Sequence, residues 1–118
     1  MEKNVLLDKS KAYAVRIVRL YQFMTEEKRE FTLSKQLLRS GTSIGANCRE
    51  AYRAQSTADF ISKLSIALKE AEEAAYWLEL LFETEYITDE QFKSVYFDNE
   101  ELVKLLVSII KTTKSHTS

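Results

Sequence analysis

The stretch "RSGTSIGANCRE", residues 39–50, decides how this chain folds, because it could form two different structures. Small residues make up most of it, and both glycines of the protein, Gly41 and Gly45, lie inside it. It is either a loop that cradles a ligand or a helix with a thin face for a neighbouring helix. A phosphate-binding loop would follow a strand and carry a Lys after its last glycine, and the sequence offers neither. We therefore interpret the stretch as helix.

A helix from about Leu33 to Ala54, with Thr32 as its N-cap, places the small residues on one side. At about 100° per residue, that side consists of Leu33, Leu37, Gly41, Ile44, Cys48 and Ala51, flanked by Ser40 and Asn47. A glycine costs a helix roughly 1 kcal/mol relative to alanine, so close approach of another helix must offset the cost. We expect that approach at Gly41, Ile44, Asn47 and Cys48. Asn47 either bonds across the contact, where it could fix helix register, or stays half exposed.

Three further helices follow from the spacing of apolar residues. One spans about residues 8–25, and its stripe is Tyr13, Ile17, Leu20 and Met24. Another starts after Ser56, which can cap it, and the last starts after Thr88, which forms a capping box with Gln91. Their stripes alternate steps of three and four residues: Ile61, Leu64, Leu68, Ala71, Ala75, Leu78 and Phe82, then Phe92, Val95, Asn99, Leu102, Leu106, Ile109 and Thr113.

Four amphipathic helices with short linkers bury these stripes most simply as an up-down-up-down bundle. The expected fold is therefore all-α, with residues 1–118 as a single domain. The composition fits, since the chain is 45% apolar and 30% charged and lacks proline. No apolar run approaches the ~18 residues of a membrane-spanning helix, and the N-terminus lacks a secretory pattern. A single cysteine, Cys48, cannot form an internal disulfide, so we expect a reduced, buried thiol and a cytoplasmic protein.

The side chains needed for metal or nucleophilic catalysis are scarce. The one histidine, His116, lies in the C-terminal tail. A carboxylate-bridged di-iron bundle needs Glu-x-x-His pairs on two helices, so no metal site is expected. A catalytic triad would need a histidine near Cys48 or a serine. We therefore expect no enzyme, no cofactor and no small-molecule substrate.

Charge is divided unevenly along the chain. Residues 1–63 carry 12 Lys and Arg against 7 Asp and Glu, a net charge of +5, and residues 64–118 carry 5 against 11, a net charge of −6. Such a split favours pairing within the molecule or head-to-tail contact between copies. A basic half can also attract nucleic acid, although the overall charge of −1 weakens that interpretation.

Two outward faces are candidates for binding. On the helix from Leu33, the face opposite the small residues carries Lys35, Arg39, Arg49 and Arg53. It is a solvated face, a phosphate-contacting face or a site for an acidic protein, and Arg16 and Arg19 could extend it. On the next helix, a second face carries Ile66, Glu70, Glu73 and Trp77. It is a second core contact or a subunit interface anchored by Trp77, with the acids meeting arginines of another copy.

Residues 43–51, "SIGANCREA", preceded by "QLLRSGT", resemble a known signature, "RxxxSIxxNIxEG". That signature belongs to four-helix-bundle proteins encoded in intervening sequences of bacterial 23S ribosomal RNA genes. The following "STADFISKLSIALKEAEEAAYWLELL" is similar to the third helix of that family, and the likeness covers nearly the whole chain. Cys48 stands where the pattern usually has Ile, and Ala51 where it often has Gly. Both departures concern packing only.

The resemblance implies a four-helix bundle that assembles into a homo-oligomeric ring, a pentamer. It also implies kinship with the accessory protein of diversity-generating retroelements, which binds nucleic acid and a reverse transcriptase. The cellular role of the family itself is largely unassigned. The sequence therefore favours a bacterial, cytoplasmic, non-enzymatic scaffold or accessory protein. The alternative is a nucleic-acid-binding module that uses the basic face.

Overall fold

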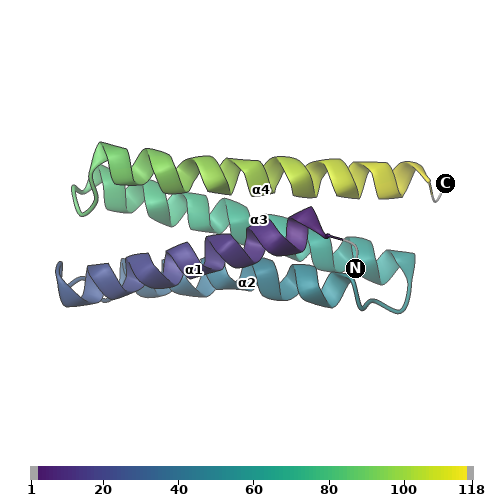
Figure 1. Ribbon diagram of the computed structural model, residues 1–118, viewed down its shortest axis with the longest axis horizontal. Coiled ribbons are helices and arrows are strands. Elements are labelled where there is room, and N and C mark those ends of the chain that lie inside the picture. The colour runs from purple at the N-terminus through teal and green to yellow at the C-terminus, as the bar shows by residue number, and fades with distance from the viewer. Residues whose placement is uncertain (1–2, 117–118) are drawn as a thin grey trace.

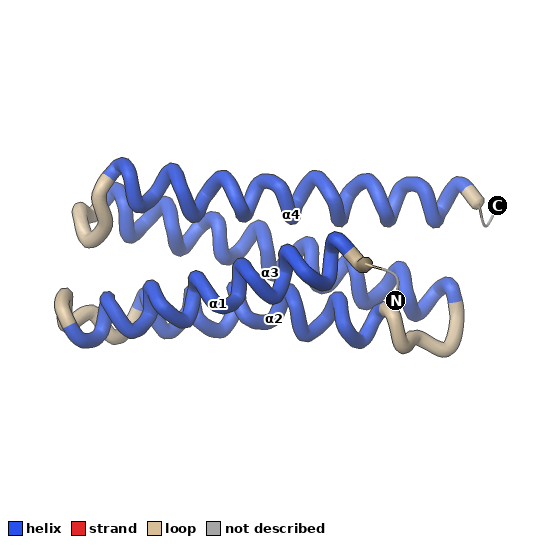
Figure 2. Tube along the Cα trace, in the orientation of Figure 1, coloured by secondary structure: helices blue, strands red, loops and turns tan. Residues whose placement is uncertain are grey.

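The structure, a computed structural model, describes residues 3–116, which form four helices joined by short turns (Figure 1). The helices are α1 (Val5–Glu26), α2 (Leu33–Ala51), α3 (Thr57–Glu83) and α4 (Asp89–Ser115). No strand occurs among the residues described (Figure 2). The chain runs up, down, up and down along a bundle of 48 × 25 × 21 Å. The expected all-α bundle is confirmed.

Each helix packs against its neighbours in sequence, and α4 also contacts α1. The α2–α3 contact is the most extensive, and the α1–α4 contact is the least. Since α1 touches both α2 and α4, it must be apolar over more of its circumference than a helix with one neighbour. Within the described part of the chain, no helix is long and apolar enough to cross a membrane.

Side-chain caps explain where three of the helices begin. The Asn4 side chain accepts a hydrogen bond from the Leu7 backbone N–H at 3.0 Å and starts α1, three residues before the expected start. Ser56 caps α3 through the N–H of Asp59, also at 3.0 Å. Thr88 and Gln91 bond to each other in the capping box that opens α4. The last two caps were predicted and are confirmed.

The start of α2 differs from the prediction. Thr32 occupies the N-cap position but makes no side-chain cap bond. Instead the carboxylate of Glu30 accepts hydrogen bonds from the backbone N–H groups of Thr32, Leu33 and Ser34, at 3.1, 2.9 and 2.8 Å. Burial raises the pKa of Glu30, but these bonds and one from the Ser34 hydroxyl outweigh it, so the pKa lies below its ordinary value. A side chain outside the helix therefore satisfies donors that a residue at its start would usually satisfy.

The end of α2 also differs, because the helix stops at Ala51 and not at Ala54. Arg53 consequently lies in the turn before α3. The turn is closed by backbone bonds from Tyr52 to Cys48 and from Arg53 to Glu50, at 3.2 and 3.1 Å.

The core surface of α3 is rotated from the predicted stripe. Leu64, Ala71 and Leu78 are fully buried as expected. The other predicted members, Ile61, Leu68, Ala75 and Phe82, are only half-buried, and Ala67, Ala74 and Leu81 are buried in their place. Two of these three are alanines, so α3 turns a smaller surface to the core than its large apolar residues suggest. Small residues at a contact let helices approach closely, which fits the extensive α2–α3 packing.

One buried amide joins three of the helices. Asn99 on α4 is 1% exposed, and its Nδ2 donates to the Tyr13 hydroxyl on α1 and to the Ala71 carbonyl on α3, both at 2.9 Å. Burial raises the pKa of Tyr13 to about 12, so its hydroxyl stays protonated at neutral pH. The sequence placed Asn99 on the core stripe of α4 but indicated no such role.

Candidate functional site

The inner face of α2 lies directly against α1. A Cβ atom on Gly41 would stand 2.9 Å from both Cγ atoms of Ile17, which is too close for real atoms. A Cβ on Gly45 would meet the Ser10 carbonyl oxygen at 3.4 Å, an ordinary contact. Residues 40–47 are helical throughout, so the stretch is not an anion-binding loop. Of the two glycines, Gly41 is the one whose missing side chain the α1 contact requires.

The other residues expected at the close helix contact are buried or bonded within α2. Ile44 and Cys48 are fully buried. Burial raises the pKa of the Cys48 thiol to about 11, so the reactive thiolate is rare at neutral pH. Asn47 is half-buried, and its Nδ2 donates to the Ser43 carbonyl of the same helix at 2.9 Å. Asn47 therefore does not bond across the helix contact, and the buried amide that links helices is Asn99.

The outer face of α2 carries the cations that the sequence singled out. Lys35, Arg39, Arg49 and Arg53 are all exposed. Two depressions lie beside these cations, one of about 430 Å³ on α2 beside Lys35 and Arg39, and one of about 450 Å³ between α1 and α2 beside Arg49 and Arg53. Thr42 lines both depressions, so the two adjoin each other at this residue and make up one paired feature. We call this feature, with its charged side chains, the basic trough.

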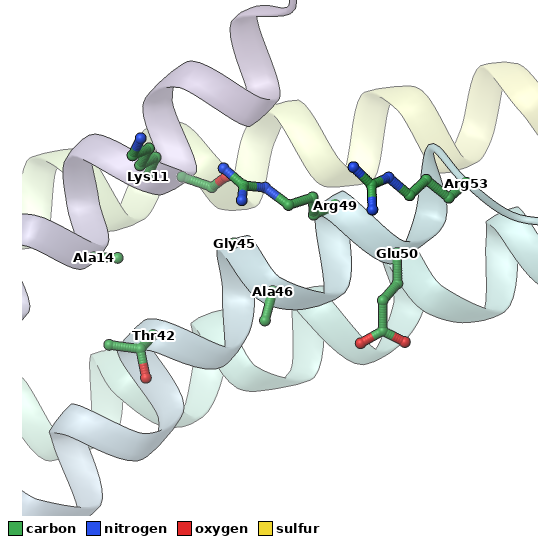
Figure 3. Close-up of a pocket in the computed structure, with 9 residues that line it drawn as sticks. Lys11, Ala14, Thr42, Gly45, Ala46, Arg49, Glu50 and Arg53 are labelled. Carbon is green, nitrogen blue, oxygen red and sulfur yellow. The ribbon is translucent and has the colours of Figure 1, made fainter.

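A fifth cation reaches the trough from α1. Lys11 of α1 lines the same depression as Arg49 and Arg53, together with Ala14, Gly45 and Ala46 (Figure 3). Sequence reasoning missed Lys11 because it lies 38 positions before Arg49, and only the α1–α2 packing brings them together. No local pattern in the sequence could have found this pairing.

The charges of the trough are not neutralised within the chain. Among residues 3–116, none of the five cations forms an ion pair. Glu50 lines the trough, but it pairs with Lys63 of α3 at 3.2 Å. Its carboxylate points away from the guanidinium groups of Arg49 and Arg53 (Figure 3). The trough therefore presents uncompensated positive charge to solvent.

Arg16 and Arg19 do not extend the trough. Arg16 pairs with Asp98 of α4 at 2.7 Å and donates to the Ser94 hydroxyl at 2.8 Å. Both arginines line a separate depression between α1 and α4. Lys9 likewise pairs with Glu101 of α4, at 3.2 Å. Part of the charge division in the sequence thus serves contacts between α1 and α4.

The second candidate face lies outside the core of α3. Ile66 is 41% exposed, Glu73 is exposed, and Glu70 is half-buried. Trp77 packs partly against the core, and its Nε1 donates to the Glu73 carboxylate at 3.4 Å. Tyr76, also exposed, meets the Trp77 ring edge-on with centroids 5.2 Å apart. We call the surface of Ile66, Glu70, Glu73 and Trp77 the α3 outer face; it combines apolar and acidic groups.

Metal-binding side chains do not gather anywhere in the described part of the chain. No three His, Cys, Asp or Glu residues of 3–116 are placed so that they could hold one ion. His116 follows α4 at its C-terminal end, far along the chain from Cys48. The basic trough and the α3 outer face are the two candidate binding surfaces.

Comparisons with known proteins agree with this architecture. Residues 2–108 match the family described as 23S rRNA-intervening sequence protein. The chain is also similar to a crystallised protein of unknown function from the S23 ribosomal protein family of Bacteroides thetaiotaomicron VPI-5482. The two are 65% identical, the match covers 91% of this chain and 99% of that one, and the TM-score is 0.90. No curated protein matches. The chain belongs to the 23S rRNA-intervening sequence protein family.

Proposed function

We propose that this protein is a non-enzymatic, cytoplasmic scaffold or accessory protein that assembles into a homo-oligomeric ring. The observation that carries the proposal is the α3 outer face, where exposed Ile66 and half-buried Trp77 adjoin two carboxylates. Aromatic anchors surrounded by polar groups are typical of protein interfaces. The family resemblance implies a ring of five copies.

The charge division supports contact between unlike surfaces of two copies. The acidic α3 outer face belongs to the half of the chain with net charge −6, and the basic trough to the half with net charge +5. An interface between different surfaces of identical chains closes into a ring when the rotation between copies allows it. A ring of this kind fits a protein that holds other molecules in place.

The test is the mass in solution of three variants, measured by light scattering at one protein concentration. Trp77→Ala and Glu70→Arg should each yield smaller species than the wild type. Glu100→Arg, which reverses a charge on α4, is the matched control and should leave the mass unchanged. An unchanged mass in both α3 variants would remove this face from the interface, and a monomeric wild type would refute assembly altogether.

The alternative function is nucleic-acid binding through the basic trough, which would then contact phosphates in place of a neighbouring copy, and kinship with the accessory protein of diversity-generating retroelements would fit it. The observation in its favour is that five exposed cations line one trough without ion pairs among residues 3–116. Lys and Arg side chains that contact phosphates release counterions, so binding of this kind weakens steeply as salt rises.

Fluorescence anisotropy with labelled RNA and DNA at two salt concentrations tests this role. Binding should weaken with salt and disappear in the double variant Arg39→Glu/Arg53→Glu. Lys104→Glu/Lys111→Glu makes the same charge change on α4 and should retain binding. Absence of binding by the wild type at low salt would exclude the role.

A further inference from the structure

We propose that the basic trough binds duplex nucleic acid by contacting the two phosphate backbones that flank one groove, rather than by following a single strand. This inference rests on the nucleic-acid role proposed above and specifies its substrate. It comes from the spacing of the cations along α2 and the turn that follows it, and from the side chains between them.

The cations form two groups with a gap. Lys35 and Arg39 are one helical turn apart on α2, about 6 Å along its axis, and Arg53 follows Arg49 by four positions in the turn that ends α2. Ten residues separate Arg39 from Arg49, which corresponds to about 15 Å along the helix. Lys11 joins the second pair from α1. The trough therefore has a charged end at each side of an uncharged middle.

The middle of the trough carries short, uncharged side chains. Thr42 and Ala46 line it, and neither carries a charge or a long side chain. The major groove of B-DNA is about 12 Å wide, and the minor groove of duplex RNA is wide and shallow. Flexible Lys and Arg side chains at the two ends could reach the backbones on either side of such a groove. The small residues between them would lie over the groove and make few contacts with base edges, so binding would depend little on base sequence.

A single strand would favour a different surface. Proteins that hold single strands combine an even line of cations with aromatic rings on which successive bases stack. No aromatic residue lines either depression of the trough within residues 3–116. Tyr52, the residue directly before Arg53, packs edge-on against the Phe60 ring, with centroids 5.3 Å apart. A duplex, whose bases are already stacked, needs no such platform.

The experiment compares four labelled probes by anisotropy: a duplex of about 20 base pairs, roughly two helical turns, as RNA and as DNA, and one strand of each. The wild type should bind the duplexes at least about tenfold more tightly than the strands, because a single strand engages one cation pair at a time. Duplex affinity should fall on the order of 100-fold between about 50 and 200 mM salt. A shuffled duplex of the same composition should bind equally.

Variants then test the two ends separately. Lys35→Ala/Arg39→Ala and Arg49→Ala/Arg53→Ala should each lower duplex affinity, reduce the salt slope by about two, and abolish the preference over single strands. Lys104→Ala/Lys111→Ala on α4 is the matched control. All six positions are exposed, so circular dichroism and melting should show intact folds.

The outcomes separate the two proposals. Single strands bound as tightly as duplexes, or loss of duplex binding from only one of the two ends, would overturn the straddling arrangement and leave nucleic-acid binding in place. No binding of any probe at low salt would overturn both. Comparison of the RNA and DNA duplexes shows which groove shape the trough fits.

Discussion

Gly41 and Gly45 stand one turn apart on α2, yet their surroundings predict opposite effects of adding a methyl group. Gly41→Ala would force the buried Ile17 side chain to move, since its Cγ atoms would lie 2.9 Å from the new Cβ. We expect a loss of about 1–2 kcal/mol in unfolding free energy. Gly45→Ala meets ordinary contacts and should gain up to about 1 kcal/mol from helix propensity.

Urea unfolding at one protein concentration measures both effects, since assembly would make stability depend on concentration. Ile17→Ala removes the clashing atoms, so adding Gly41→Ala to that variant should cost much less than adding it to the wild type. If both glycine substitutions change the unfolding free energy by the same small amount, the α1–α2 contact does not require a glycine at position 41.

Glu30 predicts a pH dependence of stability. Its carboxylate caps α2, and its pKa lies below the ordinary value of 4.5. The stabilisation is therefore present above about pH 4.5 and is lost as pH falls through the lower pKa of the folded state. Glu30→Ala should cost about 1–2 kcal/mol at neutral pH. Unfolding curves of the two proteins should converge in acid, and a gap independent of pH would contradict the role of the charge.

Lys11 and Glu30 show why sequence reasoning missed important side chains. Glu30 lies outside the helix it caps and two positions before the residue that capping rules select. Lys11 becomes part of the trough only through the packing of α1 on α2. Lys35, Arg39 and Arg49 could be predicted because helical periodicity alone places them on one face of α2. The position of a side chain could be predicted where it depends only on residues nearby in the sequence, and not where it depends on the packing of helices.

Helix α4 is tied to α1 and α3 by Asn99, and this predicts a strong coupling between two polar side chains. Asn99→Leu should cost about 2–3 kcal/mol, because the Tyr13 hydroxyl loses its partner while buried. Adding Tyr13→Phe to Asn99→Leu removes both polar groups and should recover much of that loss. A double-mutant cycle by urea unfolding measures the coupling, and strictly additive effects would contradict it.

The helices themselves were predictable to within a few residues, since caps and apolar periodicity act locally. The face that α3 buries was predicted only in part, because Ile61 and Leu68 are more apolar than Ala67 and Ala74, which are buried in their place. Hydrophobicity favours the larger residues, whereas close packing against a neighbouring helix favours the smaller ones. The thin face of α2 could be predicted from the sequence, because glycine destabilises a helix unless close packing of a neighbour offsets the cost.

Some charged side chains of the molecule form ion pairs between helices, and others are exposed on its surface. Lys9 and Arg16 pair with carboxylates across the α1–α4 contact, which is the least extensive of the bundle. The trough cations have no such partners among residues 3–116, and the α3 outer face carries acids beside exposed apolar groups. Two unlike surfaces thus remain open on a small bundle: the α3 outer face is suited to another copy, and the basic trough is suited to the acidic groups of that copy or to phosphates.

Native mass spectrometry of the wild-type protein tests the proposed assembly most directly. The ring predicts a single dominant species of five copies of the 13.7 kDa chain, which persists on dilution. A species of 13.7 kDa at every concentration, or a ladder of masses without a closed end point, would contradict it.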